Sequence, residues 1–385
     1  MRIALCTFYP VFSGTGGAEK VFWLMANEFA NRGHEVTAIG FEKTYMNPFF
    51  EVRKDVCCVN VGIDYHKSVF VNIKSIFQFG DEKRRSYRDF KEGVRKGQRI
   101  LPVLQKINPD VIISYQIEMT YVLTEILKVS CPVITMCHNT IDVLLEGKKR
   151  FYEALEKCDC IQVLLPSYSL KMKSYLAPKR VEYIPNIVPQ YEEEPKYESH
   201  VIINVGRVDR EQKQQHLLIQ AFAQAHKKHP SWCLEFWGDT TYDEEYFREC
   251  CRLVEVYNLK DKVKFCGVTK NVVEQLKRGS IFAFPSAFEG FPLALTEAMS
   301  MGLPTIGYKT CPGSNELIID GKNGFLVDDG VDSLAEAMAI LMENKDLRVK
   351  LGKHAKMDMK QFAPKIIWDK WEQLINDVVN IKVIV

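Results

Sequence analysis

Apolar segments with the character of buried strands alternate with helical segments twice along this chain, and this alternation constrains the fold more than any other feature. In the first half, an apolar run at residues 3–8 precedes a glycine-containing loop, a helix that stops at Gly33, and a second apolar run at 36–40. The same order begins again at Val201. Strands that alternate with helices pair in parallel, so the sequence predicts an α/β protein of two doubly wound, Rossmann-like domains facing across a cleft.

The stretch between the two alternating regions reads as a linker. Residues 189–200 are acidic, poor in apolar side chains and interrupted by proline. We therefore expect an N-terminal domain over residues 1–188 and a C-terminal domain over 200–364. A last helix is predicted from Lys365 onward.

Composition limits the classes of function. With 385 residues, 46% of them apolar, the chain can fill two hydrophobic cores. A net charge of +2 indicates no polyanionic partner and no nucleic acid. The 12 cysteines form no Cys-x2-Cys pair, which favours reduced thiols over a metal site. Reduced thiols in turn indicate a cytoplasmic protein. No apolar run approaches the roughly 18 residues that a membrane-spanning helix needs.

One stretch, Phe288–Met299, has the features of a ligand site. It follows an apolar run at 281–285 and opens a helix at Pro292, so its first backbone amides form a potential anion site. Two carboxylates, Glu289 and Glu297, frame these amides, and sugar hydroxyls are suitable donors to them. Taken alone, a helix N-terminus with ordinary acidic residues remains the simpler interpretation.

A second loop between a strand and a helix contains two cations. Arg207 and Lys213 follow the apolar run that begins at Val201 and precede a helix predicted at 215–228. A bidentate guanidinium and an ammonium suit a pyrophosphate. No Asp-x-Asp element stands in a suitable loop, so no metal site is predicted.

These two stretches resemble the donor site of retaining GT-B glycosyltransferases, in particular glycosyltransferase family 4 (group 1), whose motif is Glu-x7-Glu. The resemblance implies that Glu289 contacts the donor sugar and Glu297 the ribose. It also implies that Arg207 and Lys213 meet the diphosphate, and it puts the backbone at Phe291 and Leu293 beside the nucleotide. It extends over most of the chain and returns the last helix, 365–385, to the first domain. The usual Gly-Gly before a later Glu is Gly313-Ser314 here.

In the first domain the resemblance covers a glycine loop and a histidine. A dinucleotide fingerprint fails there because Glu19 replaces its third glycine. The loop is similar to the family's Gly-Gly-Ala-Glu segment, which implies that Gly16 and Gly17 let the backbone approach the donor phosphate and the acceptor. A tight turn without a ligand remains open. His138 follows a predicted strand; a lone histidine is usually structural, but its place resembles the family's cleft histidine near the donor sugar.

A long helix predicted at 81–106 is rich in basic residues over 83–99, with Tyr87, Val94 and Leu101 spaced by seven. It is either a solvated surface helix or a surface that docks on an anionic bilayer, as the resemblance implies.

The resemblance therefore implies a retaining, metal-independent hexosyltransferase. It would move a hexose or N-acetylhexosamine from a UDP- or GDP-sugar, with no other cofactor, to a glycan or lipid-linked glycan in surface polysaccharide or glycolipid synthesis. We expect it in the cytoplasm, peripherally at the inner face of the cell membrane. The alternatives are a nucleotide-sugar epimerase or hydrolase of the same fold, and a non-catalytic nucleotide-binding relative.

Overall fold

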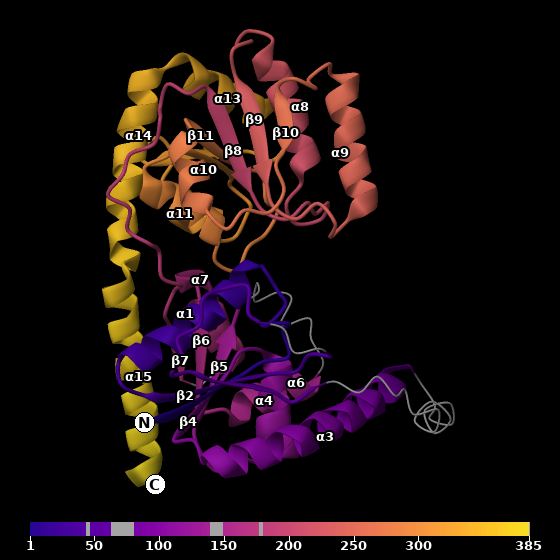
Figure 1. Ribbon diagram of the computed structural model, residues 1–385, viewed down its shortest axis with the longest axis vertical. Coiled ribbons are helices and arrows are strands. Elements are labelled where there is room, and N and C mark those ends of the chain that lie inside the picture. The colour runs from indigo at the N-terminus through magenta and orange to yellow at the C-terminus, as the bar shows by residue number, and fades with distance from the viewer. Residues whose placement is uncertain (44–46, 63–80, 139–148, 177–179, 385) are drawn as a thin grey trace. The chain divides into compact units, whose positions relative to one another are not determined.

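The computed structural model describes residues 1–43, 47–62, 81–138, 149–176 and 180–384. The chain divides into two compact units, each described here by itself (Figure 1). Unit 1 comprises Met1–Ile184 together with Trp368–Val385, and unit 2 comprises Pro185–Ile367.

The described residues of unit 1 form a seven-stranded, all-parallel sheet in the order β3-β2-β1-β4-β5-β6-β7. Its strands are β1 Arg2–Cys6, β2 Glu35–Gly40, β3 Cys57–Asn60, β4 Val111–Ser114, β5 Val133–Cys137, β6 Cys160–Val163 and β7 Val181–Tyr183. The central strands are apolar and buried along most of their length, as strands covered on both faces must be.

Helices lie on both sides of this sheet (Figure 1). They are α1 Gly17–Asn31, α3 Asp81–Ile107, α4 Ile117–Tyr121 with the π-helical turn η1 Val122–Ile126, α6 Lys149–Lys157, α7 Pro166–Tyr175 and the last helix α15 Pro364–Ile384. Trp368 and Trp371 of α15 pack edge-on against Phe29 of α1, with ring centroids 6.0 and 6.4 Å away. The end of the chain thus completes the core of unit 1.

Unit 2 repeats the arrangement with a six-stranded parallel sheet, in the order β10-β9-β8-β11-β12-β13 among its described residues. The strands are β8 Val201–Val205, β9 Cys233–Trp237, β10 Val263–Phe265, β11 Ile281–Phe284, β12 Thr305–Tyr308 and β13 Gly324–Val327. The helices are α8 Gln215–His226, α9 Glu244–Val256, α10 Val272–Arg278, α11 Leu293–Met301, α12 Ser314–Leu317, α13 Val331–Glu343, α14 Lys345–Asp358 and the 3-10 turn η2 Met359–Phe362.

The helices of unit 2 form two layers. Helix α8 packs beside α9 and α13, whereas α11 packs beside α10 and α14 (Figure 1). Both sheets therefore show the doubly wound order, in which the chain leaves the first strand toward one edge and later returns toward the other. This confirms the predicted α/β class and creates a topological switch point next to β1 in unit 1 and next to β8 in unit 2.

The acidic stretch predicted as a linker is bound to unit 2. The Tyr197 hydroxyl donates to the Gly302 carbonyl at 2.8 Å, and buried Arg348 donates to the Tyr197 carbonyl at 2.7 and 3.1 Å. The chain therefore passes between the units at Ile184–Pro185 and not within the acidic stretch. Backbone carbonyls, which sequence composition does not reveal, hold the stretch in place.

Helix α3 has the predicted position, and Tyr87, Val94 and Leu101, the residues spaced by seven, are each partly buried. Ile100 and Leu104 are buried, Gly93 and Gly97 let the helix approach η1 closely, and Phe90 is exposed. A Cβ on Gly97 would lie 3.0 Å from Leu127 Cδ2. Side chains before Tyr87 in this helix are outside the described part. Among the described residues, no helix is both long and apolar enough to cross a membrane.

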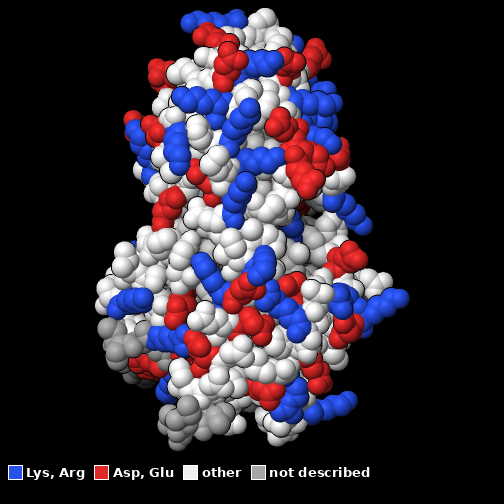
Figure 2. All heavy atoms as spheres, turned by 90° about the vertical axis from the view of Figure 1, so that its left-hand side faces the viewer, with Lys and Arg blue, Asp and Glu red and all other residues white. Residues whose placement is uncertain are grey.

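Charge is mixed on the side of each unit that Figure 2 turns toward the viewer. Acidic and basic side chains of the described residues are interspersed over the visible surface of either unit.

Candidate active site

The switch point of unit 2 lies between β8 and β11, which are hydrogen-bonded neighbours although distant in sequence. The chain leaves β8 toward α8 and leaves β11 toward α11, so the two loops diverge at the carboxyl ends of the strands. Ligands of doubly wound sheets bind in such a crevice. The loop after β8 contains Arg207 and Lys213, and the loop after β11 contains Glu289.

Asp209 organises the first of these loops. Its Oδ1 accepts hydrogen bonds from the backbone amides of Glu211 and Gln212 at 3.1 and 3.0 Å. The Gln215 side chain binds the loop from the other side, accepting from the Asp209 amide and donating to the Arg207 carbonyl. The loop is therefore held in one conformation by buried polar groups.

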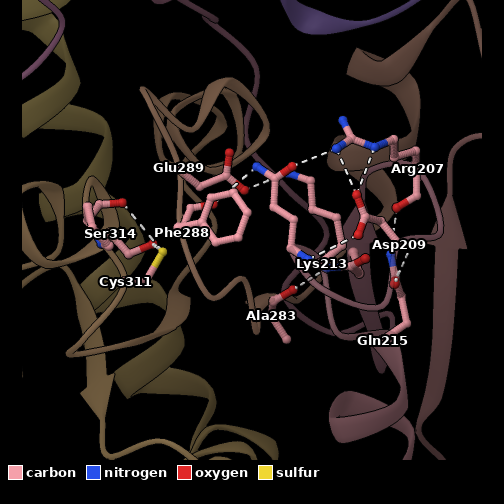
Figure 3. Close-up of polar contacts among 12 residues, drawn as sticks. Arg207, Asp209, Lys213, Gln215, Ala283, Phe288, Glu289, Cys311 and Ser314 are labelled. Atoms are coloured by element: carbon pink, nitrogen blue, oxygen red, sulfur yellow. Dashed lines mark hydrogen bonds and ion pairs between the residues drawn. The ribbon is translucent and has the colours of Figure 1, made fainter. Parts of the chain in front are cut away.

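The same aspartate orients Arg207. The Nε and Nη2 atoms of Arg207 donate to Asp209 Oδ2 at 3.0 and 2.7 Å, and Nη2 also donates to Gln212 Oε1 at 2.7 Å (Figure 3). The guanidinium lies 4.5 Å from the ring centroid of Tyr242, a cation–π distance. Arg207 is thus directed by three partners while remaining partly open to solvent.

Lys213 and Glu289 form an ion pair between the two loops. Lys213 Nζ lies 2.6 Å from Glu289 Oε1, and the side chains are only 14% and 9% exposed (Figure 3). The aliphatic part of Lys213 runs along Gly206, and Nζ lies 5.2 Å from the Phe284 ring centroid. Desolvating two charges costs free energy that their attraction often does not recover, so such a pair is more readily explained by function than by stability.

Two further bonds tie the loops together. Gln212 Nε2 donates to the Phe288 carbonyl at 3.1 Å, and the Ala287 amide donates to the Gln212 carbonyl at 2.9 Å. Arg207 is therefore linked through Gln212 to the loop that holds Glu289.

Helix α11 starts one residue later than expected, because Pro292 is its N-cap and Leu293 its first residue. Its first intrahelical bond runs from the Thr296 amide to the Pro292 carbonyl, so the amides of residues 293–295 have no partner within the helix. The Phe291 ring is buried against Phe362, with centroids 5.7 Å apart, so the backbone of Phe291 is the part of this residue that a ligand could contact.

Glu297 is buried on α11, one turn into the helix. Burial, and secondarily the nearby Glu297 carboxylate, raises the pKa of Tyr191.

Gly313 packs against the N-terminal end of helix α11: its φ is +88°, and a Cβ there would lie 2.9 Å from Pro292 Cδ. Only glycine fits both conditions.

Gly16 and Gly17 begin α1 in unit 1, as N-cap and first helical residue. A Cβ on Gly16 would lie 2.6 Å from Glu19 Oε2, so the Glu19 carboxylate folds back against the glycine loop. A carboxylate at the third helical position commonly bonds back toward the N-cap. Glu19 belongs to the Gly-Gly-Ala-Glu segment, but the motif does not reveal that its carboxylate brings negative charge to this loop.

His138 follows β5 in unit 1. Its ring lies on Tyr115, with centroids 4.1 Å apart, and its Nε2 is buried with no hydrogen-bond partner in the part of the chain that the structure describes. Burial lowers the pKa of His138 to about 3, so the imidazole is neutral at physiological pH. A neutral ring with an unpartnered nitrogen can accept or donate one hydrogen bond, depending on its tautomer.

The structure thus brings Arg207, Lys213 and Glu289 to one switch point, with the N-terminal end of α11 in the same unit. Asp209, Gln212 and Tyr242 join them, and sequence reasoning missed all three because their roles depend on contacts rather than on a motif. Within the described residues, no group of three or more His, Cys, Asp or Glu side chains is arranged to hold a metal ion.

Two parallel sheets with this strand order define the protein as an α/β protein of the GT-B class. Its fold matches sucrose-phosphate synthase of Thermosynechococcus elongatus with a TM-score of 0.78 at 17% identity, covering 98% of both chains. It also matches HepE of Anabaena in complex with UDP and glucose, with a TM-score of 0.73 at 17% identity over 98% of this chain and 100% of that one.

Sequence comparisons give the family. The profile described as Glycosyltransferase Family 4 matches residues 15–190, and the profile described as Glycosyl transferases group 1 matches residues 190–358. This chain belongs to glycosyltransferase family 4, the group 1 glycosyltransferases.

Two relatives show how far the similarity extends. An exopolysaccharide phosphotransferase of Streptomyces coelicolor is 32% identical over 207 residues, which is 53% of this chain but only 21% of that relative. A Campylobacter jejuni enzyme, named as an α-1,4-N-acetyl-D-galactosaminyltransferase acting on a diphospho-undecaprenol-linked glycan, is 24% identical over 380 residues. That match covers 95% of this chain and 96% of the relative.

Proposed function

We propose that this protein is a retaining glycosyltransferase that moves a hexose or N-acetylhexosamine from a nucleotide sugar to a glycan or lipid-linked glycan acceptor. The observation on which the proposal rests is the buried Lys213–Glu289 ion pair at the switch point of unit 2. A charged pair in this position is poised to exchange partners when a charged ligand arrives.

The proposed exchange starts from the diphosphate. In the structure each cation is neutralised, Lys213 by Glu289 and Arg207 by Asp209. A donor diphosphate has more negative charge than either carboxylate and matches the fork of the guanidinium. The cations and the first amides of α11 would then stabilise the charge that develops on the leaving diphosphate.

The carboxylate that Lys213 releases would take a second role. Glu289 would accept hydrogen bonds from hydroxyls of the transferred sugar, and Glu297 would accept from the ribose. In this scheme Lys213 and Arg207 supply the positive charge that a metal ion supplies elsewhere, so transfer would be independent of a metal. Retention, with attack on the face that the diphosphate leaves, is proposed from the family resemblance.

The acceptor is proposed from the named relatives. The Campylobacter jejuni enzyme acts, by its name, on a lipid diphosphate-linked glycan, and a Bacillus subtilis relative is named a poly(glycerol-phosphate) α-glucosyltransferase. One name describes a glycan carried on a lipid diphosphate and the other a glycerol-phosphate polymer. They support a role for this chain in surface polysaccharide or glycolipid synthesis.

The test is a screen of UDP- and GDP-linked hexoses and N-acetylhexosamines. Binding is measured first, as a rise in melting temperature. The nucleotide sugar that binds is then incubated with a membrane lipid extract, and released UDP or GDP and the glycosylated product are quantified. We expect one nucleotide series to bind and to be turned over, with the anomeric configuration of the donor retained in the product.

We expect turnover to persist in EDTA, because the proposed scheme has no step that uses a metal. Activity that disappears with EDTA and returns with Mg²⁺ or Mn²⁺ would contradict the metal-independent scheme. Isomerised or hydrolysed donor without a glycosylated product would favour the epimerase or hydrolase alternative.

A further inference from the structure

The switch point of unit 1, between β1 and β4, contains a glutamine whose oxygens are fully engaged. Gln116 follows β4, and its Oε1 accepts three hydrogen bonds from the loop after β1. The donors are the Thr7 hydroxyl at 3.0 Å, the Phe8 amide at 2.9 Å and the Tyr9 amide at 3.2 Å. Because backbone amides only donate, the atom that faces them is the amide oxygen, and the orientation of the side chain is fixed.

The backbone of Gln116 is held as firmly. Its carbonyl accepts from the Ser114 hydroxyl at 2.9 Å and from the amides of Met119 and Thr120 at 3.1 Å each. The Thr120 hydroxyl is a further donor to this carbonyl at 3.3 Å, so seven donor contacts hold the two oxygens of this one residue.

One group of Gln116 is left over. Its Nε2 has two N–H donors and no partner among the residues that the structure describes, and the residue is half-buried, not enclosed. A surface glutamine usually rotates freely and binds water. This side chain cannot rotate without losing three bonds, so its N–H donors are held in a fixed direction at low entropic cost to a ligand.

The surroundings favour an uncharged ligand. Lys96 of α3, the cation recorded over the Phe8 ring of this loop at 4.1 Å from its centroid, is paired with Glu92 at 2.7 Å. The Glu19 carboxylate lies against the glycine loop of the same unit. The recorded contacts of Lys96 and Glu19 thus give no reason to expect an anion here, whereas a hydroxyl or an acetamido carbonyl needs only a neutral donor.

We propose that Gln116 Nε2 donates a hydrogen bond to an oxygen of the acceptor sugar, either a hydroxyl or an N-acetyl carbonyl. The inference rests on the proposed function, which assigns the nucleotide sugar to unit 2 and leaves the switch point of unit 1 for the second substrate. It makes Gln116 a residue that determines acceptor specificity.

Gln116→Glu is the informative variant. A carboxylate can still accept from Thr7, Phe8 and Tyr9, so the loop is retained, whereas both N–H donors are lost and a ligand oxygen faces another acceptor. Gln105→Glu is the matched control, since it makes the same change of group and charge at an exposed position on α3.

The probes are p-nitrophenyl α-glycosides of glucose and galactose and their 2-acetamido analogues, titrated with saturating UDP or GDP and followed by ligand-observed NMR. At least one glycoside is expected to bind the wild type and the Gln105 variant. Its affinity for the Gln116 variant is expected to fall about tenfold or more. The affinity for UDP or GDP, measured by calorimetry, is expected to be the same in all three proteins.

A measurement on the wild type guards against a loop that rearranges in the variant. The side-chain NH2 signals of Gln116, identified by their loss in the variant, are expected to shift when the glycoside is added. Unchanged signals, equal glycoside affinity in the wild type and the Gln116 variant, or no glycoside binding to the wild type would each overturn the inference. A fall in nucleotide affinity alone would assign Gln116 to the donor and also overturn it. Failure of the proposed function would differ, because the nucleotide itself would then not bind.

Discussion

At the scale of single residues, the candidate site of unit 2 is a set of neutralised charges. Arg207 and Lys213 each lie against a carboxylate at hydrogen-bond distance. Such pairs hold the cations in position before a ligand arrives, and the reorganisation that remains is the exchange of one anion for another.

Removing either partner of the buried pair should abolish most activity. We expect Lys213→Ala or Glu289→Gln to lower turnover by about 10²-fold or more, equivalent to roughly 2.7 kcal/mol of transition-state stabilisation. Initial rates at saturating donor measure this. Lys264→Ala, at an exposed position on β10, is the control. Near wild-type rates in both site variants, with melting temperatures unchanged, would remove these residues from the mechanism.

His138 should make unit 1 sensitive to acid. Its pKa is lowered to about 3 from an ordinary value of 6.5, so between these pH values the unfolded chain binds a proton that the folded chain does not. Stability is therefore retained above pH 6.5 and lost as the pH falls below it, by about 1.4 kcal/mol per pH unit at most. Hydrogen exchange of β1 amides, compared at pH 7 and 5.5, measures the loss of stability of unit 1. The stability lost between pH 7 and 5.5 should be smaller in His138→Asn than in the wild type. Equal losses in the two proteins would show that His138 is not the source of the acid sensitivity.

At the scale of elements, helix α3 shows what a pattern in the sequence can and cannot reveal. Its extent is evident from charge and periodicity. The face that contacts η1 is not evident in the same way, because Gly93 and Gly97, which have no side chains, lie at this contact. A search for apolar residues overlooks such a face.

The outer surface of α3 remains a proposed membrane contact. Arg88, Lys91 and Arg95 are exposed, and each basic residue near an anionic surface adds roughly 1 kcal/mol of binding. Changing these three to Glu should reduce co-sedimentation with phosphatidylglycerol vesicles at low salt, and the binding of the wild type should weaken at high salt. The same change at exposed Lys227, Lys228 and Lys264 of unit 2 is the charge-matched control. If both triple variants lose binding equally, α3 is an ordinary solvated helix.

Local signals explain why so many elements could be predicted. Helix α1 ends at Asn31 because Gly33 adopts a φ of +87°, and the strands are apolar runs of the expected length. The candidate site can be predicted from local sequence signals only in part. A motif marks Lys213 and Glu289, but their pairing, and the parts of Asp209 and Gln116, follow from contacts between segments far apart in the chain.

At the scale of the molecule, the chain passes from unit 1 to unit 2 and back again. The core of unit 1 depends on helix α15, with which the chain returns to this unit. Trp371 is buried, and its ring packs edge-on against that of Phe29. A core that contains side chains from both ends of the sequence is incomplete without either end.

Truncating that tryptophan should therefore destabilise unit 1 selectively. We expect Trp371→Ala to cost about 3–5 kcal/mol in the stability of unit 1, the usual range for a buried aromatic side chain. Hydrogen exchange should accelerate at β1 and β2 but not at β8 and β11. Gln373→Ala, at an exposed position on α15, controls for the change in helix propensity. Equal acceleration in both sheets would mean that the two units unfold as one.

The path of α15 also sets an order of events on the ribosome. Every strand of unit 2 is translated before Trp368 and Trp371, so unit 2 can fold while synthesis continues. Unit 1, although translated first, must wait with Phe29 uncovered until the last helix emerges. The nascent chain thus presents an incomplete unit 1 to chaperones while unit 2 is translated, and unit 2, although made second, is the first to reach its final form.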